Sequence, residues 1–393
     1  MGRGQKLSYL GRWLPGYLWQ RLSRRRPPSK THLIFALADH FEPAIMPEDG
    51  WARAPYSEQE RRLERWCHEY PIRFGAYRDA EGRPLVHSYF YPAEQYDQPL
   101  IARLVEHCRA GWGEIEIHLH HGVDAPDSAE NTRHQLIEFR DRLAGHHGCL
   151  SYWGESTEPR YAFVHGNFAL ANSNHGHACG VDSEMQILAE TGCYADMTLP
   201  TGAFHPAQIA KINSIYECAL PLTEQAPHRK GRDLSRGRFP NVFPLIVQGP
   251  LMLGFRSGGG TRRIVGIDNA AVTGPNPATL QRLGRWKRAA ISVNGRPDWL
   301  FIKLHCHGMD SRHEEAVLGS AMQKFLRELT EGAEQRNEVL HFASAREMVN
   351  IILAACDGRE GNPGEFRDYQ LKRVRPGGSE SRQTEQSIAV PKG

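Results

Sequence analysis

Histidines stand at alternate positions in two segments of the chain, each time directly after an apolar run. The first pair, His118 and His120, lies in EIEIHLHHG, and the second pair, His305 and His307, lies in WLFIKLHCHG. Residues two apart in a β-strand project to the same side, so each pair is expected to share one face. Burying neighbouring imidazoles is costly unless something compensates, and a divalent metal ion is the commonest compensation. The spacing therefore predicts a metal site at two strand ends.

A third group of chemically capable residues follows the first apolar run of the chain. LIFALADHFEP places Asp39, His40 and Glu42 together. An aspartate in this position is often only a cap for a turn or helix. Beside two histidine pairs, however, it provides the carboxylate that a mixed nitrogen and oxygen metal site, or a general base, requires. We expect these three residues to take part in the same site.

Two further polar segments are candidates for substrate contact. In VHGNFALANSNHGHACG, His165 ends an apolar run and Asn167 opens an asparagine-rich turn, whose amides could donate hydrogen bonds to a substrate or an oxyanion. In CYADMTLPTG, Asp196, Pro200 and Gly202 follow another apolar run. The bland alternatives are a solvated loop in the first case and an ordinary turn in the second. We expect the five residues named from these two segments to contact the substrate.

The elements that must position these residues alternate between strands and helices. The strand candidates are the apolar runs 33–39, 85–91, 114–120, 161–166, 193–199, 243–249, 299–307 and 339–342, and the helix candidates include 128–144, 313–331 and 344–355. This alternation predicts an α/β fold around a mainly parallel sheet or barrel. Each histidine pair stops at a glycine, Gly122 or Gly308. Both pairs are therefore expected at the carboxyl ends of their strands, where active sites form in α/β barrels.

The composition is that of a globular protein and excludes fibrous and wholly disordered classes. The 393 residues are 40% hydrophobic and 24% charged, and the eight cysteines form no CxxC pair, so neither a zinc ribbon nor a disulfide scaffold is indicated. No apolar run approaches the ~20 residues of a membrane span, and none resembles a secretory signal. We expect a cytoplasmic protein, with residues 357–393 forming a disordered polar tail.

Charge is divided unevenly along the chain. The formal net charge is only +3, from 48 basic and 45 acidic side chains, but residues 1–30 hold eight basic residues and no acidic one. The remainder is therefore net acidic, which argues against a nucleic-acid-binding surface. We interpret residues 1–30 as a loosely ordered basic arm. It could contact the inner membrane face peripherally through Trp13, Tyr17, Trp19 and Leu22.

The order of these motifs resembles the polysaccharide deacetylase superfamily, the NodB-homology carbohydrate esterases. The segments that carry the resemblance are ADHFEP, EIHLHHG, VHGNFALANS, TGCYADMTLP and FIKLHCHG, and it extends over about residues 31–356. The resemblance implies a distorted seven-stranded (β/α) barrel and a divalent metal ion, for which zinc is the expected identity. It also implies removal of N-acetyl groups from a polysaccharide or amino-sugar substrate.

The first two motifs of that superfamily supply its base and its metal ligands. The first is a pair of aspartates, one the catalytic base and the other a metal ligand, and the matching positions here are Asp39 and His40. The second supplies two histidines four residues apart. Here HLHHG has histidines at 118, 120 and 121, and a glycine at the fourth position. The second carboxylate and the usual histidine spacing are therefore both missing.

The remaining motifs match more loosely. The third, a turn beside the oxyanion site, corresponds to Leu199, Pro200 and Gly202, and the last, which carries a general-acid histidine, corresponds to Leu304 and His305. His307 competes with His305 for that role.

The working hypothesis is metal-dependent hydrolysis of a carbon-nitrogen bond that is not a peptide bond. An ion would be held by His118, by His120 and by a carboxylate or imidazole from residues 39–42. Asp39 would accept a proton from water, and His305 or His307 would protonate the leaving amine. Two other classes stay open. An amidohydrolase-type barrel also uses HxH, although at its first strand, and a non-catalytic carbohydrate-binding descendant would have lost the chemistry with the second aspartate.

Overall fold

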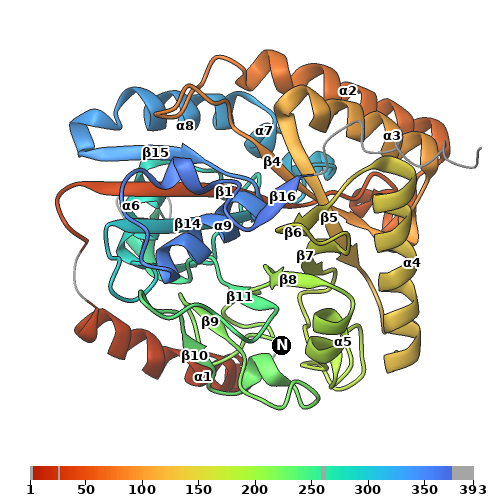
Figure 1. Ribbon diagram of the computed structural model, residues 1–393, viewed down its shortest axis with the longest axis horizontal. Helices are drawn as coiled ribbons and strands as arrows, with labels where there is room; N and C mark the ends of the chain where they lie inside the picture. Colours follow the sequence, from red (N-terminus) through yellow and green to blue (C-terminus); the bar gives the residue numbers. More distant parts are fainter. Residues whose placement is uncertain (1–2, 25–26, 258–262, 374–393) are drawn as a thin grey trace, which may run out of the picture.

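The computed structural model describes the chain except for residues 1–2, 25–26, 258–262 and 374–393. The described residues form a mixed α/β fold in which helices surround one large, mostly parallel sheet (Figure 1). Two small sheets accompany it, one made by β2 (Ile45–Met46) and β3 (Ala52–Arg53) and the other by β12 (Met252–Ser257) and β13 (Arg263–Asp268). The α/β prediction is thereby confirmed.

Strand β1 (Thr31–His40) lies at the centre of the large sheet. It pairs along one edge with β14 (Trp299–Cys306), while β15 (Glu338–Phe342) and β4 (His87–Pro92) share its other edge, all in parallel. Beyond β4 the spatial order continues through the parallel strands β5 (Gly113–Leu119), β7 (Pro159–His165), β8 (Cys193–Asp196) and β11 (Leu245–Val247), and then through the antiparallel β9 (Ile215–Glu217) and β10 (Arg232–Asp233). Each strand candidate from the sequence corresponds to a strand of this sheet.

Alternate residues of the strands enter two separate apolar clusters. On β1, Leu33 and Phe35 belong to a cluster that contains Trp66, whereas Ile34 and Ala36 belong to a second cluster. The same alternation continues on β14, where Trp299 and Phe301 belong to the second cluster and Leu300 and Ile302 to the first. We refer to them as the Trp66 cluster and the Trp299 cluster. Strands buried on both faces are typical of parallel sheets.

Eight helices connect or cover the strands in the described parts of residues 31–373. They are α2 (Tyr56–Phe74), α3 (Gln98–His107), α4 (Ala129–His147), α5 (Glu184–Glu190), α6 (Leu280–Arg288), α7 (Glu314–Val317), α8 (Ser320–Glu331) and α9 (Ala345–Cys356). Side-chain caps begin several of them, since Ser128 accepts the amide hydrogen of Asn131 and Ser344 forms a capping box with Glu347. The helix expected at 313–331 is broken between α7 and α8 because Gly319 is extended there.

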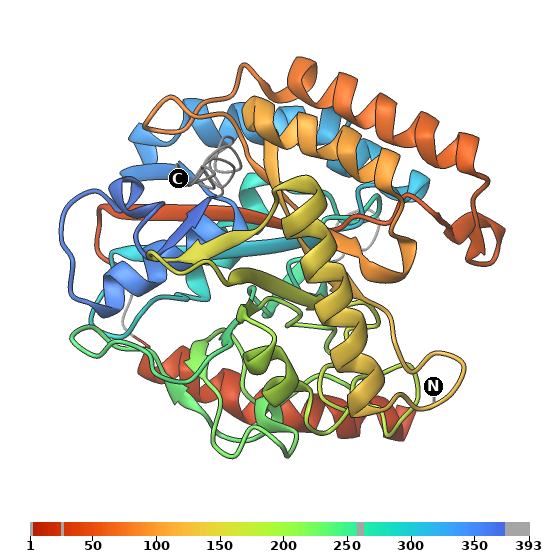
Figure 2. The ribbon, with the colours of Figure 1, turned by 45° about the vertical axis from the view of Figure 1, so that its right-hand side comes forward.

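Most of the predicted arm, Arg3–Ser23, is helical rather than loosely ordered, so that prediction was wrong. Helix α1 (Arg3–Ser23) lies along the rim of the molecule (Figures 1 and 2). Trp13 is fully buried and donates from Nε1 to the carbonyl of Ala203 at 3.1 Å, and Tyr17 is buried one turn later. The physical reason is the i, i+4 spacing of the two aromatic residues, which makes one apolar stripe that is stabilised by burial against the body. No helix among the described residues is long and apolar enough to cross a membrane.

The tail expected to be disordered from residue 357 is folded as far as residue 373. A short 3-10 helix, η7 (Pro363–Phe366), precedes β16 (Leu371–Arg373), which pairs with β6 (Ser151–Trp153). Asn350 of α9 fixes this segment, because its side chain donates to the carbonyl of Leu371 and accepts the amide hydrogen of Leu371, both at 2.8 Å. The remainder of the predicted tail, 374–393, lies outside the described residues.

Three polar residues, Glu114, Glu116 and His118, follow one another along the same face of β5. Glu116 is fully enclosed, accepts the amide hydrogen of Ala162 at 2.6 Å, and accepts the hydroxyl hydrogen of Tyr194. Burial raises the pKa of Glu116 to about 8, although both hydrogen bonds oppose the rise. At neutral pH the folded protein therefore holds this carboxyl group mainly protonated.

We expect Glu116 to make the folded state less stable as pH rises. Its folded pKa of about 8 lies above the ordinary value of 4.5, so its contribution is complete below about pH 4.5 and is lost as pH rises through 8. Glu116→Gln, which imitates the protonated carboxyl, should remove a decline of up to a few kcal/mol in the free energy of unfolding across this range. Urea denaturation at several pH values measures it. The exposed Glu60→Gln variant is the control, and a Glu116→Gln profile parallel to wild type would contradict the expectation.

Candidate metal centre

The carboxyl ends of β1, β5 and β14 bring the predicted histidines together. The ring centroids of His40 and His118 are 4.7 Å apart, those of His118 and His120 are also 4.7 Å apart, and those of His40 and His307 are 4.6 Å apart. His305 lies slightly further away, at 6.3 Å from His40. Since parallel strands end at the same edge of a sheet, segments separated by nearly 270 positions meet here.

His118 and His120 point the same nitrogen at one carboxylate oxygen. His118 Nε2 lies 3.2 Å from Glu42 Oε1, and His120 Nε2 lies 3.0 Å from the same oxygen. The other nitrogens are engaged elsewhere, because His118 Nδ1 is 2.9 Å from the carbonyl of Val164 and His120 Nδ1 is 2.6 Å from Glu94 Oε1. Both of those partners can only accept, so each Nδ1 carries its hydrogen and donates it.

This geometry requires a positive charge between the three groups. With the hydrogen on Nδ1, a neutral imidazole presents a lone pair at Nε2, and two such lone pairs face the carboxylate of Glu42. A proton or a metal ion relieves that repulsion. Burial opposes the charged form of His120, but contacts with Glu42 and Glu94 outweigh it and raise its pKa to about 10. Histidines that donate Nδ1–H to a carboxylate or a carbonyl are the usual metal-ligating arrangement.

His40 completes a group of donors around this point. His40, Glu42 and His118 are all buried and offer ligand atoms within 4.8 Å of one another. His40 Nδ1 is enclosed and has no hydrogen-bond partner among the described residues. Burial, and next the neighbouring His307 and His118, hold the pKa of His40 well below its ordinary value, so the ring is neutral and retains a lone pair. The donor chemistry therefore fits a divalent ion.

Asp39, the predicted base and metal ligand, lies on the opposite face of β1. Asp39 Oδ2 accepts a hydrogen bond from His87 Nε2 at 2.8 Å, and Oδ1 accepts the amide hydrogen of Gly308 at 2.6 Å. Consecutive strand residues project to opposite faces, so Asp39 faces the Trp66 cluster while His40 faces the other side. Cys306 is near His87, with Sγ 3.9 Å from Nε2, and burial raises the pKa of its thiol. This second group is held together by its own hydrogen bonds and supports the turn at Gly308.

His121, the third predicted ligand in HLHHG, belongs to another group. It is buried between two carboxylates, with Nδ1 2.7 Å from Asp127 Oδ2 and Nε2 3.0 Å from Glu184 Oε1. These contacts outweigh burial and raise the pKa of His121 to about 9. His165 is close by, with ring centroids 4.7 Å apart, but its Nδ1 accepts the amide hydrogen of Asn167 at 3.1 Å. A neutral His165 therefore carries its hydrogen on Nε2, and the group fits a protonated His121 better than a metal ion.

The two histidines of the last motif take different positions. His305 is buried at the end of β14, and its Nδ1 has no partner among the described residues. Burial, and then Lys303 and His307, hold its pKa well below the ordinary value. His307 is half-buried and lies against His40. Phe168 covers this group, with ring centroids 4.6 Å from His40 and 5.6 Å from His305.

The loop after β7 presents several unsatisfied polar atoms. His165 Nε2, Asn167 Nδ2 and Ser173 Oγ are enclosed and have no partner among the described residues. The loop touches the centre directly, since a Cβ at Gly166 would come within 2.3 Å of the His120 ring. All three atoms can donate a hydrogen bond, which is the property expected of a site that binds hydroxyl or carbonyl oxygens.

Asp196, Pro200 and Gly202 lie at and after the end of β8, and Asp196 is linked to His165 through Thr198. Asp196 accepts the hydroxyl hydrogen of Thr198 at 2.7 Å, and the same hydroxyl accepts the amide hydrogen of His165 at 2.9 Å. Burial raises the pKa of Asp196 to about 7. Leu199–Pro200 is a cis peptide bond, and Gly202 continues the same turn. Asp196 thus positions the backbone of His165 through the hydroxyl of Thr198.

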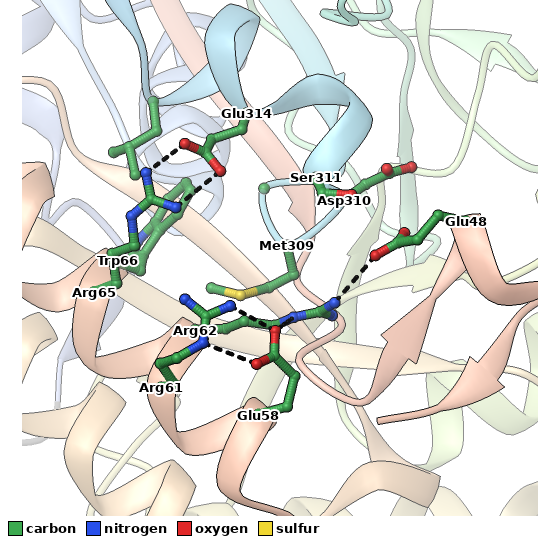
Figure 3. A pocket seen from close by; sticks show the side chains of 12 residues that line it. Glu48, Glu58, Arg61, Arg62, Arg65, Trp66, Met309, Asp310, Ser311 and Glu314 are labelled. Atoms are coloured by element: carbon green, nitrogen blue, oxygen red, sulfur yellow. Dashed lines mark hydrogen bonds and ion pairs between the residues drawn. The ribbon is translucent and has the colours of Figure 1, made fainter. Parts of the chain in front are cut away.

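A cleft of about 600 Å³, open mouth included, is lined by none of the predicted site residues (Figure 3). Arginines and carboxylates line it in pairs: Arg65 contacts Glu314 with Nη1–Oε2 at 3.0 Å, and Arg62 contacts Glu58 at 2.8 Å. Gly308 contributes to its wall and joins it to Asp39 on the other side of the turn. The charged side chains of the cleft already neutralise one another. The buried group of His40, Glu42 and His118 is therefore the stronger candidate for a catalytic site.

Several residues that shape the centre were not predicted from the sequence. Glu94, Asp127 and Glu184 are each bonded to a predicted histidine, and His87 is bonded to Asp39. Glu94 follows the carboxyl end of β4, so strand order offered a signal for it. Glu184 opens a helix remote in sequence, and no local pattern marks it.

Comparison with known proteins was made for the whole chain. A scan of protein-family models found no match, and a search of curated proteins found no similar sequence.

The network around His121 is expected to be a major source of stability. Glu184→Gln leaves His121 facing an amide and weakens the hydrogen bond that Oε2 accepts from the amide of Ala171. Breaking one side of a buried charge pair typically lowers the free energy of unfolding by about 3–5 kcal/mol. Chemical denaturation measures the loss. Glu190→Gln, an exposed change on the same helix, should cost little, and equal effects of the two variants would contradict this account.

Proposed function

We propose that the chain is a metal-dependent hydrolase of carbon-nitrogen bonds that removes N-acetyl groups from a carbohydrate substrate, as a divergent member of the polysaccharide deacetylase superfamily. One observation carries the proposal. His118 and His120, with their Nδ1 hydrogens already donated, direct Nε2 toward the same oxygen of Glu42, and a ring nitrogen of His40 lies within 4.8 Å of ligand atoms of Glu42 and His118. Such a convergence is unfavourable unless a proton or a cation lies between the groups, and a divalent ion would in addition use a lone pair of the neutral His40.

The donor set favours zinc as the ion. Imidazole nitrogens with one carboxylate oxygen are typical zinc ligands, and magnesium or calcium would prefer oxygen alone. His118, His120 and Glu42 would hold it, with His40 as a fourth donor. A divalent ion there supplies Lewis acidity, which polarises an acyl carbonyl and acidifies water.

The residues of the chain then divide the proton transfers. Asp39 is not available as a base, because both of its oxygens accept hydrogen bonds on the other face of β1. His305 is neutral, buried and unpartnered at Nδ1. We propose that His305 accepts the proton that water loses. It then donates this proton to the leaving nitrogen of the substrate as the acyl carbon-nitrogen bond breaks. His307 packs against His40 and orients it.

The loop at 165–173 is the proposed substrate contact. His165 Nε2–H and the amide of Asn167 are donors without partners in the described residues, and Ser173 adds a hydroxyl. Hydroxyl groups and acyl oxygens of an acetylated sugar are acceptors that match them. Phe168 covers the histidines from the same loop and would limit the room for the acyl group.

We also propose that the sheet is the distorted seven-stranded barrel of this superfamily. Seven strands are joined in parallel, in the order β14, β1, β4, β5, β7, β8 and β11. The two ends of this series approach one another, since a Cβ at Gly249, just after β11, would lie 2.4 Å from the carbonyl oxygen of Lys303 on β14. Lys303 Nζ also donates to the carbonyls of Met197 and Leu199, which follow β8.

Bound metal is the first test. Protein purified without chelators should contain stoichiometric zinc by atomic emission, and His118→Ala/His120→Ala should lose it because two of its donors are gone. The control variant, His134→Ala/His146→Ala, removes two exposed histidines of α4 and should keep the metal. Unchanged zinc in the His118/His120 variant would exclude the proposed site. A wild type without any bound divalent ion would favour the non-catalytic carbohydrate-binding alternative.

Catalysis is the second test. The zinc-loaded protein should release acetate from N-acetylated amino sugars or their oligomers. His305→Gln should lower kcat by about 10²–10⁴-fold, the usual contribution of a proton-transfer residue, with zinc content unchanged. His307→Gln should have a much smaller effect. A larger loss with His307→Gln would reverse the assignment, and no acetate release from any acetylated sugar would refute deacetylation.

A further inference from the structure

The outward face of α1 is apolar although it lies at the surface. Leu18, Trp19 and Leu22 are 52%, 71% and 85% exposed, and Pro15 is exposed beside them. At 100° per residue these four side chains lie on one side of the helix, opposite the buried Trp13. Figure 1 places α1 at the lower edge of the molecule.

Hydrogen bonds from the margins and from the buried side of α1 hold this face in a fixed position. Arg12 donates to the carbonyl of Pro206 and Gln20 donates to the carbonyl of Ile212, both at 2.7 Å, in addition to the bond between Trp13 and Ala203. Arg24 reaches the carbonyls of Asn213 and Ala289, both at 2.5 Å. The exposed apolar side chains are therefore presented by an ordered helix, and a partner would not need to fold it.

Basic side chains lie at both margins of the apolar face. Residues 1–30 contain eight basic residues and no acidic one, while the rest of the chain is net acidic. Arg12 and Arg21 flank the exposed stripe on its two sides, and the exposed Arg288 lies next to Arg21, whose side chain donates to its carbonyl at 3.2 Å. A planar, anionic and partly apolar partner matches this pattern.

We propose that α1 docks on an anionic lipid membrane, with Leu18, Trp19 and Leu22 inserted among the headgroups and the helix parallel to the surface. Arg12, Arg21 and Arg288 then face lipid phosphates. An amphipathic helix that carries Trp and Leu on one side and Arg at the margins is typical of interfacial binding. This inference is independent of the proposed enzymatic function, since none of these residues belongs to the metal centre.

Vesicle sedimentation with the full-length protein tests the proposal. Wild type should bind vesicles that mix phosphatidylglycerol with phosphatidylcholine, and should bind pure phosphatidylcholine far more weakly. Trp19→Ser/Leu22→Ser should lower the partition coefficient by at least about tenfold, because the inserted apolar area is lost. Added salt should weaken wild-type binding by screening the arginines.

A matched control carries the same chemical change elsewhere on the surface. Trp51→Ser/Ile72→Ser removes side chains that are 62% and 69% exposed and should bind vesicles like wild type. Circular dichroism and thermal denaturation should show both variants folded, since Trp13 and Tyr17 remain.

Three outcomes would overturn the proposal: no vesicle binding by the wild type, equal binding to neutral vesicles, or equal losses in the two variants. A fourth outcome would assign the face to a second copy of the chain. In that case light scattering would show a wild-type dimer that Trp19→Ser/Leu22→Ser dissociates, and the wild type would not bind vesicles.

Discussion

One carboxylate oxygen of Glu42 faces the Nε2 atoms of two histidines whose Nδ1 atoms already donate to other groups. The arrangement of the site depends on this contact between one carboxylate and two imidazoles. These groups come from four strands. Glu42 follows β1, Glu94 follows β4, His118 and His120 stand at the end of β5, and Val164 belongs to β7. The parallel register of these four strands is therefore what brings the donors together. A buried cluster of this kind is stable only when its charges compensate one another, so a cation bound there would also tie the strands to each other.

The alternation of strand residues separates two polar networks that share the same strand ends. On the Trp299-cluster side are His40, His118 and His305, and on the Trp66-cluster side are Asp39, His87 and Cys306. The second network positions the first. Asp39 accepts the amide hydrogen of Gly308, and a Cβ at that glycine would lie 2.3 Å from Asp39 Oδ2, so the turn that carries His307 can approach only because residue 308 is a glycine.

The sequence was sufficient for the parts of the site that depend on local periodicity. A spacing of two placed His118 with His120, and parallel strand ends brought them to His40 and His307. The same rule, applied to adjacent residues, separates Asp39 from His40 and His121 from His120, although all four were predicted from the sequence to take part in one site. Glu184 and Asp127 were beyond prediction because their contacts with His121 depend on tertiary packing rather than on spacing along the chain. The burial of α1 was missed for a related reason: Trp13 and Tyr17 form a visible stripe, but the surface that covers them, at 203–212, lies nearly 200 residues away.

The central position of β1 has a consequence for synthesis of the protein. β1 is the first strand to be made, but β14 and β15, which pair with it, begin at residues 299 and 338. At ribosomal rates of 5–20 residues per second, an apolar strand that is buried on both faces in the finished protein waits roughly 15–60 s for its last neighbour. During that interval its backbone edge and its apolar side chains are available for wrong pairing, so β1 is the segment where a chaperone would protect the nascent chain most effectively.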